Sequence, residues 1–180
     1  MSDGPIVAFS DGASKGNPGP GGWGVVIVTA DGIVTELGGR AAHTTNNRME
    51  LTGAIEALNE IRDLAGRVAV YTDSTYVIKG ISEWIWGWRR RGWKTAEGNE
   101  VLNRDLWERL AGLVDARGKG GIEWHYVRGH VGTPGHERVE KPDRVVVELR
   151  LGCLGSRCHG RLRRREPNEA RRTSSRGSAR

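Results

Sequence analysis

Residues 46–64 read NNRMELTGAIEALNEIRDL, and this stretch determines how the chain on either side of it is arranged. Its apolar residues recur every three or four positions, which predicts an amphipathic helix over residues 48–64. These residues are Leu51, Ala54, Ile55, Leu58 and Ile61. Asn47, with Glu50 three residues later, resembles a capping box that would begin the helix.

β-rich segments precede and follow this helix. Before it, residues 6–10, 23–29 and 33–38 favour strands, and the Asp31-Gly32 pair between the last two favours a tight hairpin. After it, residues 68–72 favour a fourth strand. Because a helix joins this strand to the earlier ones, we expect it to run parallel to the first.

The rest of the regular pattern continues to about residue 127. Residues 76–86 and 102–116 favour helices, and residues 122–127 favour a fifth strand, with a final helix expected after it. This order predicts an α/β fold, a five-stranded mixed sheet flanked by helices.

Charge is distributed unevenly along the 180 residues. The net charge is +6 and the pI is about 9.8, which suggests a nucleic-acid partner. Residues 141–180, however, hold 12 Lys and Arg against 4 Asp and Glu, so the first 140 residues carry a net charge of −2. A case for nucleic-acid binding therefore has to rest on local clusters of basic residues.

Three acidic residues lie at corresponding places in the pattern. Asp11 follows the first strand, Asp73 follows the fourth, and Glu50 lies in the first turn of the helix between them. Each alone could be a turn or capping residue. Parallel neighbouring strands would bring all three together, and converging carboxylates are costly unless divalent cations neutralise them. A pair of such cations can cut a phosphodiester bond.

Aromatic and basic residues alternate over residues 84–94, WIWGWRRRGWK. One interpretation is a helix with core tryptophans and a solvated arginine end, which could account in part for Trp84 and Trp107. A sugar–phosphate backbone explains the stretch better, because guanidinium groups bind phosphate while indole rings pack on sugars or bases. We therefore expect Trp84, Trp88 and the residues Arg89, Arg90 and Arg91 to contact substrate.

Several longer motifs carry a resemblance to one family. They lie at residues 9–12 (FSDG), 16–22 (GNPGPGG), 44–51 (TTNNRMEL), 72–74 (TDS), 84–95 (WIWGWRRRGWKT), 103–107 (NRDLW) and 127–130 (VRGH). Over about the first 140 residues the chain resembles bacterial ribonuclease H type I. The resemblance implies an endonuclease that hydrolyses the RNA strand of RNA–DNA hybrids and leaves 5′-phosphate and 3′-hydroxyl ends.

The resemblance also assigns catalytic roles. It implies that Asp11, Glu50 and Asp73 bind two Mg²⁺ ions, with Asp11 bridging both and Mn²⁺ as a possible substitute. His130 matches a loop histidine that would move a proton or help product leave, although a histidine in such a loop could otherwise be a surface residue.

Substrate contacts follow from the same resemblance. Asn17, Asn46 and Asn47 would contact the minor groove of the hybrid, where 2′-hydroxyl groups distinguish RNA. Competing roles are loop structure for Asn17 and helix capping for Asn47. The arginine stretch corresponds to a basic protrusion that grips the DNA strand.

The chain departs from the family after His130. His136 stands where the family usually has asparagine, and Glu140 stands in place of a fourth catalytic and metal-binding aspartate. The longer side chain displaces the carboxylate, and Pro142 falls inside the expected final helix, where proline removes a hydrogen bond.

These features give a ribonuclease H domain over residues 1–140, an atypical final helix at about residues 137–151, and a basic tail over residues 152–180 that we expect to be disordered. Cys153 and Cys158 match no metal site. No leader or membrane span is apparent, so we expect a cytoplasmic monomer. Two alternatives are a hybrid-binding protein that has lost catalysis through its changed C-terminal segment, and a different nuclease or strand-transferase of the same broad fold.

Overall fold

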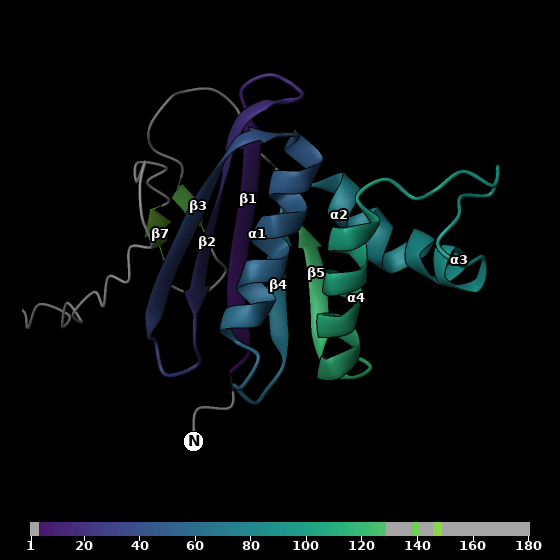
Figure 1. Ribbon diagram of the computed structural model, residues 1–180. Coiled ribbons are helices and arrows are strands. Elements are labelled where there is room, and N and C mark those ends of the chain that lie inside the picture. The colour runs from purple at the N-terminus through teal and green to yellow at the C-terminus, as the bar shows by residue number, and fades with distance from the viewer. Residues whose placement is uncertain (1–3, 129–137, 141–145, 149–180) are drawn as a thin grey trace, which may run out of the picture.

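A computed structural model describes residues 4–128, 138–140 and 146–148 of the protein. Five strands form the main sheet: β1 (Ile6–Ser14), β2 (Gly19–Val28), β3 (Val34–Thr44), β4 (Val68–Thr72) and β5 (Ile122–Tyr126). They lie in the order β3-β2-β1-β4-β5 (Figure 1). Strands β1, β2 and β3 pair antiparallel, while β4 pairs parallel to both β1 and β5. The predicted mixed sheet is confirmed.

The first three strands are longer than the sequence pattern indicates. Strand pairing runs through positions such as Ala13 opposite Gly22 and Trp23 opposite Gly39. Glycine contributes no side chain to an alternating pattern, so these ends of the strands leave little trace in the hydrophobic periodicity.

Five helical elements follow the predicted pattern. They are α1 (Asn46–Glu60), α2 (Thr75–Lys79), the π-helix η1 (Gly80–Trp84), α3 (Ile85–Arg90) and α4 (Arg104–Arg117). Capping of α1 differs from the prediction: Thr45, not Asn47, is the N-cap, and its hydroxyl accepts a hydrogen bond from the Arg48 amide at 3.4 Å. Threonine and asparagine both cap well, and the local pattern alone did not separate them.

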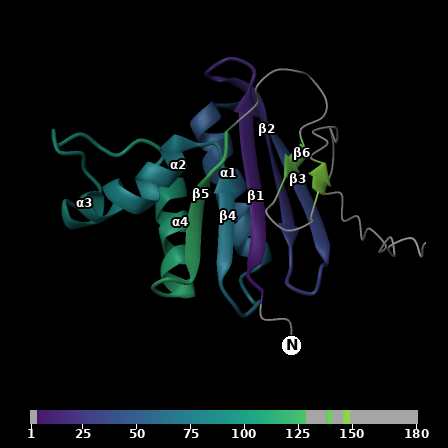
Figure 2. The same ribbon diagram turned by 180° about the vertical axis from the view of Figure 1, so that it is seen from behind.

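Both faces of the sheet are apolar. On one face, Ile6, Ala8 and Val70 lie in a buried cluster with α1 and α4. The four periodic residues within α1 and Ile61, its C-cap, are all buried there. On the other face lies a second cluster made of Val7, Phe9, Val26, Val28 and Ala69. Both α1 and α4 lie on the first face, and none of the described helices covers the second (Figure 2).

The described residues near the C-terminus differ from the expected final helix over 137–151. Strands β6 (Arg138–Glu140) and β7 (Val146–Glu148) pair antiparallel, with Glu140 opposite Val146. Pro142 between them cannot donate to a helix, and the β-branched valines of β7 favour a strand. The other residues of this segment lie outside the described ranges. Across the described residues, no helix combines the length and the apolar character that crossing a membrane requires.

Candidate active site

Asp11 and Asp73 lie at the same height on neighbouring parallel strands. Phe9 of β1 pairs with Tyr71 of β4. Asp11 lies two residues beyond Phe9, and Asp73 lies two residues beyond Tyr71. Asp73 directly follows β4, whereas Asp11 lies within β1, which continues to Ser14 while paired with β2. Both residues are half-buried. The predicted meeting of the two strand positions is therefore confirmed.

Gly12 brings the start of α1 against β1. A Cβ atom on Gly12 would lie 2.3 Å from the Glu50 backbone nitrogen and 2.3 Å from the Met49 carbonyl carbon. Any larger residue here would push the helix away from the strand. The glycine after Asp11 thus allows Glu50 to approach the ends of both strands.

Glu50 is held through both oxygens of its carboxylate. Oε1 accepts a hydrogen bond of 2.6 Å from the Asn46 side-chain amide, and Oε2 accepts one from the Ser74 hydroxyl. Burial is the largest cause of a raised pKa at Glu50, and the charges of Asp73 and Asp11 raise it further, while the two hydrogen bonds lower it. The net effect is a raised pKa, because burial and repulsion outweigh these bonds.

Hard carboxylate oxygens that repel one another suit a divalent cation, which would reverse the repulsion. The strand register puts Asp11 and Asp73 at one height, and the charges of both raise the pKa of Glu50. Among the described residues, no three His, Cys, Asp or Glu side chains are gathered closely enough to enclose an ion as they stand. The donor chemistry therefore fits a metal, while the Glu50 side chain is turned toward Asn46 and Ser74.

The three asparagines predicted to bind substrate lie around the start of α1. Asn17 is exposed, and its side-chain oxygen accepts a hydrogen bond of 3.4 Å from the Asn46 backbone amide. Asn47 is exposed in the first turn of α1. Asn46 differs from both, because its side-chain amide is engaged by Glu50. The three asparagines thus lie near one another, and the side chain of Asn46 is hydrogen-bonded to the Glu50 carboxylate.

The tryptophans and arginines of residues 84–91 divide between two faces of one helical stretch. Trp84 and Trp88 are half-buried and tilted against each other; Trp84 meets Tyr76 edge to face, and Trp88 meets the fully buried Trp107 in the same way. Gly80 permits this packing, because a Cβ there would lie 1.9 Å from the Trp107 ring. These two tryptophans therefore have a core role, as the alternative interpretation held.

The arginines differ from one another. Arg89 is half-buried and forms a two-pronged contact with Asp115 at 2.6 and 3.3 Å, and its guanidinium lies 5.9 Å from the Trp86 ring. Arg90 is exposed. Arg91 is exposed as well and donates to the Lys94 carbonyl at 3.2 Å. Trp86, which was not predicted as a substrate contact, is 58% exposed beside Arg89.

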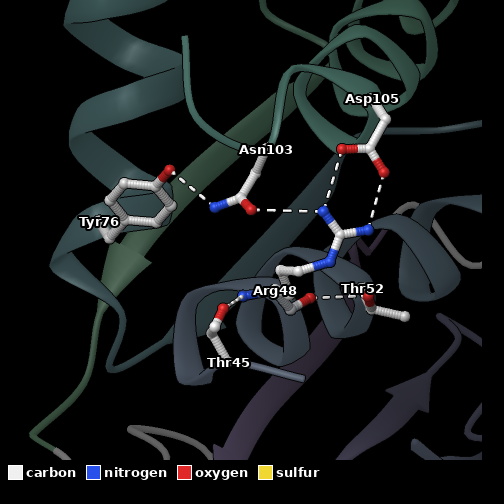
Figure 3. A network of polar contacts seen from close by, with 6 residues as sticks. All are labelled: Thr45, Arg48, Thr52, Tyr76, Asn103 and Asp105. Carbon is white, nitrogen blue, oxygen red and sulfur yellow. Dashed lines mark hydrogen bonds and ion pairs between the residues drawn. The ribbon is translucent and has the colours of Figure 1, made fainter. Parts of the chain in front are cut away.

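A polar network fixes the start of α1 to α4 and α2 (Figure 3). The Arg48 guanidinium donates to both carboxylate oxygens of Asp105, at 2.8 and 3.0 Å, and to the Asn103 side-chain oxygen at 3.3 Å. The Asn103 amide donates to the Tyr76 hydroxyl at 3.3 Å, and Trp107 donates to the same hydroxyl at 3.1 Å. The helix that carries Glu50 is therefore linked to the tryptophan cluster.

Comparison with known proteins assigns this arrangement to a family. The sequence model of the family described as RNase H matches residues 3–148. The chain belongs to the RNase H family. It is 58% identical over 134 residues to a ribonuclease H of Thermosynechococcus vestitus, a match covering 73% of this chain and 82% of the relative. It is 50% identical over 151 residues to the ribonuclease HI of Pseudomonas syringae pv. tomato, covering 83% and 97%.

Solved structures of RNase H proteins share the fold. LC9-RNase H1, described as a type 1 RNase H with the type 2 active-site motif, gives a TM-score of 0.59 at 33% identity. The similarity covers 73% of this chain and 66% of the LC9 chain. The five-stranded sheet and its helices are thus those of an RNase H fold.

For two residues that are expected to act in an RNase H site, the structure gives no side-chain position. His130 lies outside the described residues. Glu140 lies in β6, a strand, whereas the resemblance placed it in a helix. Both assignments stay predictions.

Sequence reasoning missed Ser74 and Trp86. Ser74 directly precedes a helix, so its N-cap role could be read locally, but its bond to Glu50 joins residues 24 positions apart. The exposure of Trp86 had a local signal, since Trp84 and Trp88 are four residues apart on one helix face and Trp86 lies between them.

Proposed function

We propose that Asp11, Glu50 and Asp73 would hold two Mg²⁺ ions, with Mn²⁺ as a substitute. Membership of the RNase H family makes the chain an endoribonuclease that acts on the RNA strand of RNA–DNA hybrids and requires divalent metal. The observation that carries the site assignment is the strand register, which puts Asp11 and Asp73 each two residues beyond the Phe9–Tyr71 pair, while the close contact at Gly12 brings the backbone of Glu50 against β1. When bound, the ions supply an activated water and stabilise the leaving 3′ oxygen.

The chain's own residues orient these ligands and the substrate. Asn46 and Ser74 hold the two oxygens of Glu50, and Gly12 sets the distance between α1 and β1. The exposed Asn17 and Asn47 then face the hybrid's minor groove, where hydrogen-bonding side chains can recognise 2′-hydroxyl groups. His130 moves a proton during turnover or product release, and Glu140 supplies a fourth carboxylate.

The basic helical stretch grips the DNA strand through its exposed face. Arg90 and Arg91 bind phosphates, while Arg89 keeps the stretch attached to α4 through Asp115. Trp84 and Trp88 support this surface from within. The protein acts as a cytoplasmic monomer.

Cleavage of a labelled RNA–DNA hybrid tests this function, beside matched RNA and DNA duplexes, with Mg²⁺ or EDTA. We expect the hybrid to be the one substrate that is cut, and we expect cleavage with Mg²⁺ but not with EDTA. Asp73→Asn should lower the cleavage rate at least about 100-fold, because it removes a ligand from a precisely placed set. Hybrid binding should persist or improve, since a charge that repels phosphate is lost.

Asp63→Asn provides the matched control. Asp63 is an exposed carboxylate just beyond the far end of α1, where it pairs with Arg62 at 3.5 Å. This variant should cleave at the normal rate. Near-normal turnover by the Asp73 variant would refute the assignment, and hybrid binding without cleavage by the unaltered chain would favour the alternative of a binding protein that has lost catalysis.

A further inference from the structure

Ser74 lies between two of the proposed metal ligands. It directly follows Asp73 at the end of β4 and is the N-cap of α2. Its backbone amide donates to the Thr72 hydroxyl at 3.2 Å, which closes a tight turn around Asp73. Ser74 is only 3% exposed, so its side chain faces the protein interior.

The direction of each hydrogen bond at the Ser74 hydroxyl is forced. The Val77 amide, 3.2 Å away, can only donate, so the hydroxyl oxygen accepts there. A serine hydroxyl has one proton, and an ionised carboxylate can only accept. The Ser74 hydroxyl therefore donates its one hydrogen bond to Oε2 of Glu50.

This bond fixes the Glu50 carboxylate from a second element. Asn46 holds Oε1 from the same helix, one turn before Glu50, and can follow any movement of α1. Ser74 holds Oε2 from the turn that also carries Asp73. A carboxylate bound at both oxygens from two elements has a defined position relative to Asp73.

We infer that Ser74 is a positioning residue that orients the Glu50 carboxylate beside Asp73 for a divalent cation. The inference rests on the proposed function, because it assumes that Glu50 and Asp73 share a metal site. Groups that orient metal ligands typically affect metal affinity by about 10–100-fold. Ser74 is thus a residue whose hydroxyl serves metal binding as well as the start of α2.

Three substitutions separate these two roles. Ser74→Ala removes both the cap and the donor to Glu50. Ser74→Gly removes the donor but keeps most of the capping preference, since glycine is nearly as good an N-cap as threonine. Ser74→Thr keeps a hydroxyl that can do both. Thr29→Ala is the matched control, because Thr29 also donates its hydroxyl to a carboxylate, that of Asp31, in the hairpin between β2 and β3.

The experiment is a Mg²⁺ titration of each full-length variant, followed by the NMR shifts of the Glu50 and Asp73 amides, together with a melting temperature in EDTA. We expect the Mg²⁺ dissociation constant to rise about tenfold or more in the Ala and Gly variants. It should return toward the original value in the Thr variant and stay unchanged in the Thr29 control. The Ala variant should also melt at a lower temperature.

A purely structural role would give a different pattern. Unchanged Mg²⁺ affinity in the folded Gly variant would overturn the inference, whatever the Ala variant does. So would a Thr variant that melts normally yet binds Mg²⁺ as weakly as the Gly variant. If the unaltered chain shows no Mg²⁺-dependent shift at Glu50 or Asp73, the proposed metal site itself fails, and that result is distinct from a failure of Ser74 alone.

Discussion

Glu50 combines burial, repulsion and hydrogen bonding at one carboxylate. Its pKa is raised in the folded protein, first by burial and then by the charges of Asp73 and Asp11. The folded state therefore binds the Glu50 proton more tightly than the unfolded state does. The corresponding stability is fully present below the unfolded pKa of about 4.3 and is lost as the pH rises through the folded pKa.

Glu50→Gln should accordingly stabilise the metal-free protein at neutral pH. The glutamine keeps the shape and removes the charge; its oxygen still accepts from Ser74, and its amide nitrogen donates to the Asn46 side-chain oxygen once the Asn46 amide turns over. Because Glu50 is only half-buried, the gain should be about 0.5 kcal/mol after solvent screening. Melting temperatures in EDTA measure it. The difference should disappear near pH 4, where the glutamate is itself protonated. An unaltered protein that is more stable than the variant at neutral pH would contradict this assignment of charges.

At the scale of elements, the stretch from α2 through η1 to α3 works as a helix with two faces. The face with Tyr76, Trp84 and Trp88 packs toward Trp107 of α4, whereas Trp86 and Arg90, four residues apart, share the other. Core packing on one face holds in place the other face, which is the one proposed to meet substrate. The predicted group of substrate contacts is thus divided by structure into supporting and exposed residues.

Arg90→Ala should weaken binding of all RNA–DNA hybrids alike and reduce the slope of log affinity against log salt by about 1. Arg89→Ala should change the slope less, because Asp115 already neutralises that guanidinium. Binding titrations at several salt concentrations measure both. Lys119→Ala, at an exposed position after α4, is the control and should leave the slope unchanged. The same slope in the Arg90 variant as in the unaltered chain would exclude a phosphate contact there.

At the scale of the whole molecule, the sheet carries a second apolar face that none of the described helices covers. Val7, Phe9 and Val26 belong to it, and Tyr71 packs at its edge. Phe9, Tyr71 and His125 stack across β1, β4 and β5 at centroid distances of 5.0 and 4.8 Å. Val7, Phe9 and Val26 are at most 8% exposed, so the surface that an amphipathic helix could still bury belongs to partly exposed neighbours such as Val34 and Tyr71. Each 100 Å² of apolar surface buried stabilises by about 2.5 kcal/mol.

Replacing everything beyond Val139 with an amphipathic helix that begins with Asp should therefore raise both the melting temperature and the hybrid cleavage rate. Glu140→Asp alone should raise neither, because residue 140 lies in a strand paired with Val146 and shortening its side chain does not rebuild a helix. Thermal melts and cleavage assays compare the two. A Gly/Ser segment of equal length is the control, and equal behaviour of chimera and native chain would show that the native segment suffices.

Prediction from the sequence succeeded where a pattern is local. The periodicity of residues 51, 54, 55, 58 and 61 gave α1, and the expected parallel pairing of the first and fourth strands gave the shared height of Asp11 and Asp73, although β1 continues past Asp11 to Ser14. It failed where two residues compete for one role, as Thr45 and Asn47 do for the cap, and where β-branched residues and Pro142 override a family expectation. The Ser74–Glu50 bond could not be predicted, because tertiary packing alone brings these residues together.

The distribution of tryptophans gives the molecule a spectroscopic use. Trp107 is fully shielded from water, whereas Trp86 is 58% exposed, so an aqueous collisional quencher should extinguish the fluorescence of Trp86 first and spare Trp107. Trp86 lies beside Arg89 on the helix proposed to meet the DNA strand. If nucleic acid covers Trp86, the quencher should no longer reach it. Loss of quenching would then report binding in real time without an attached dye, and recovery of quenching would report release.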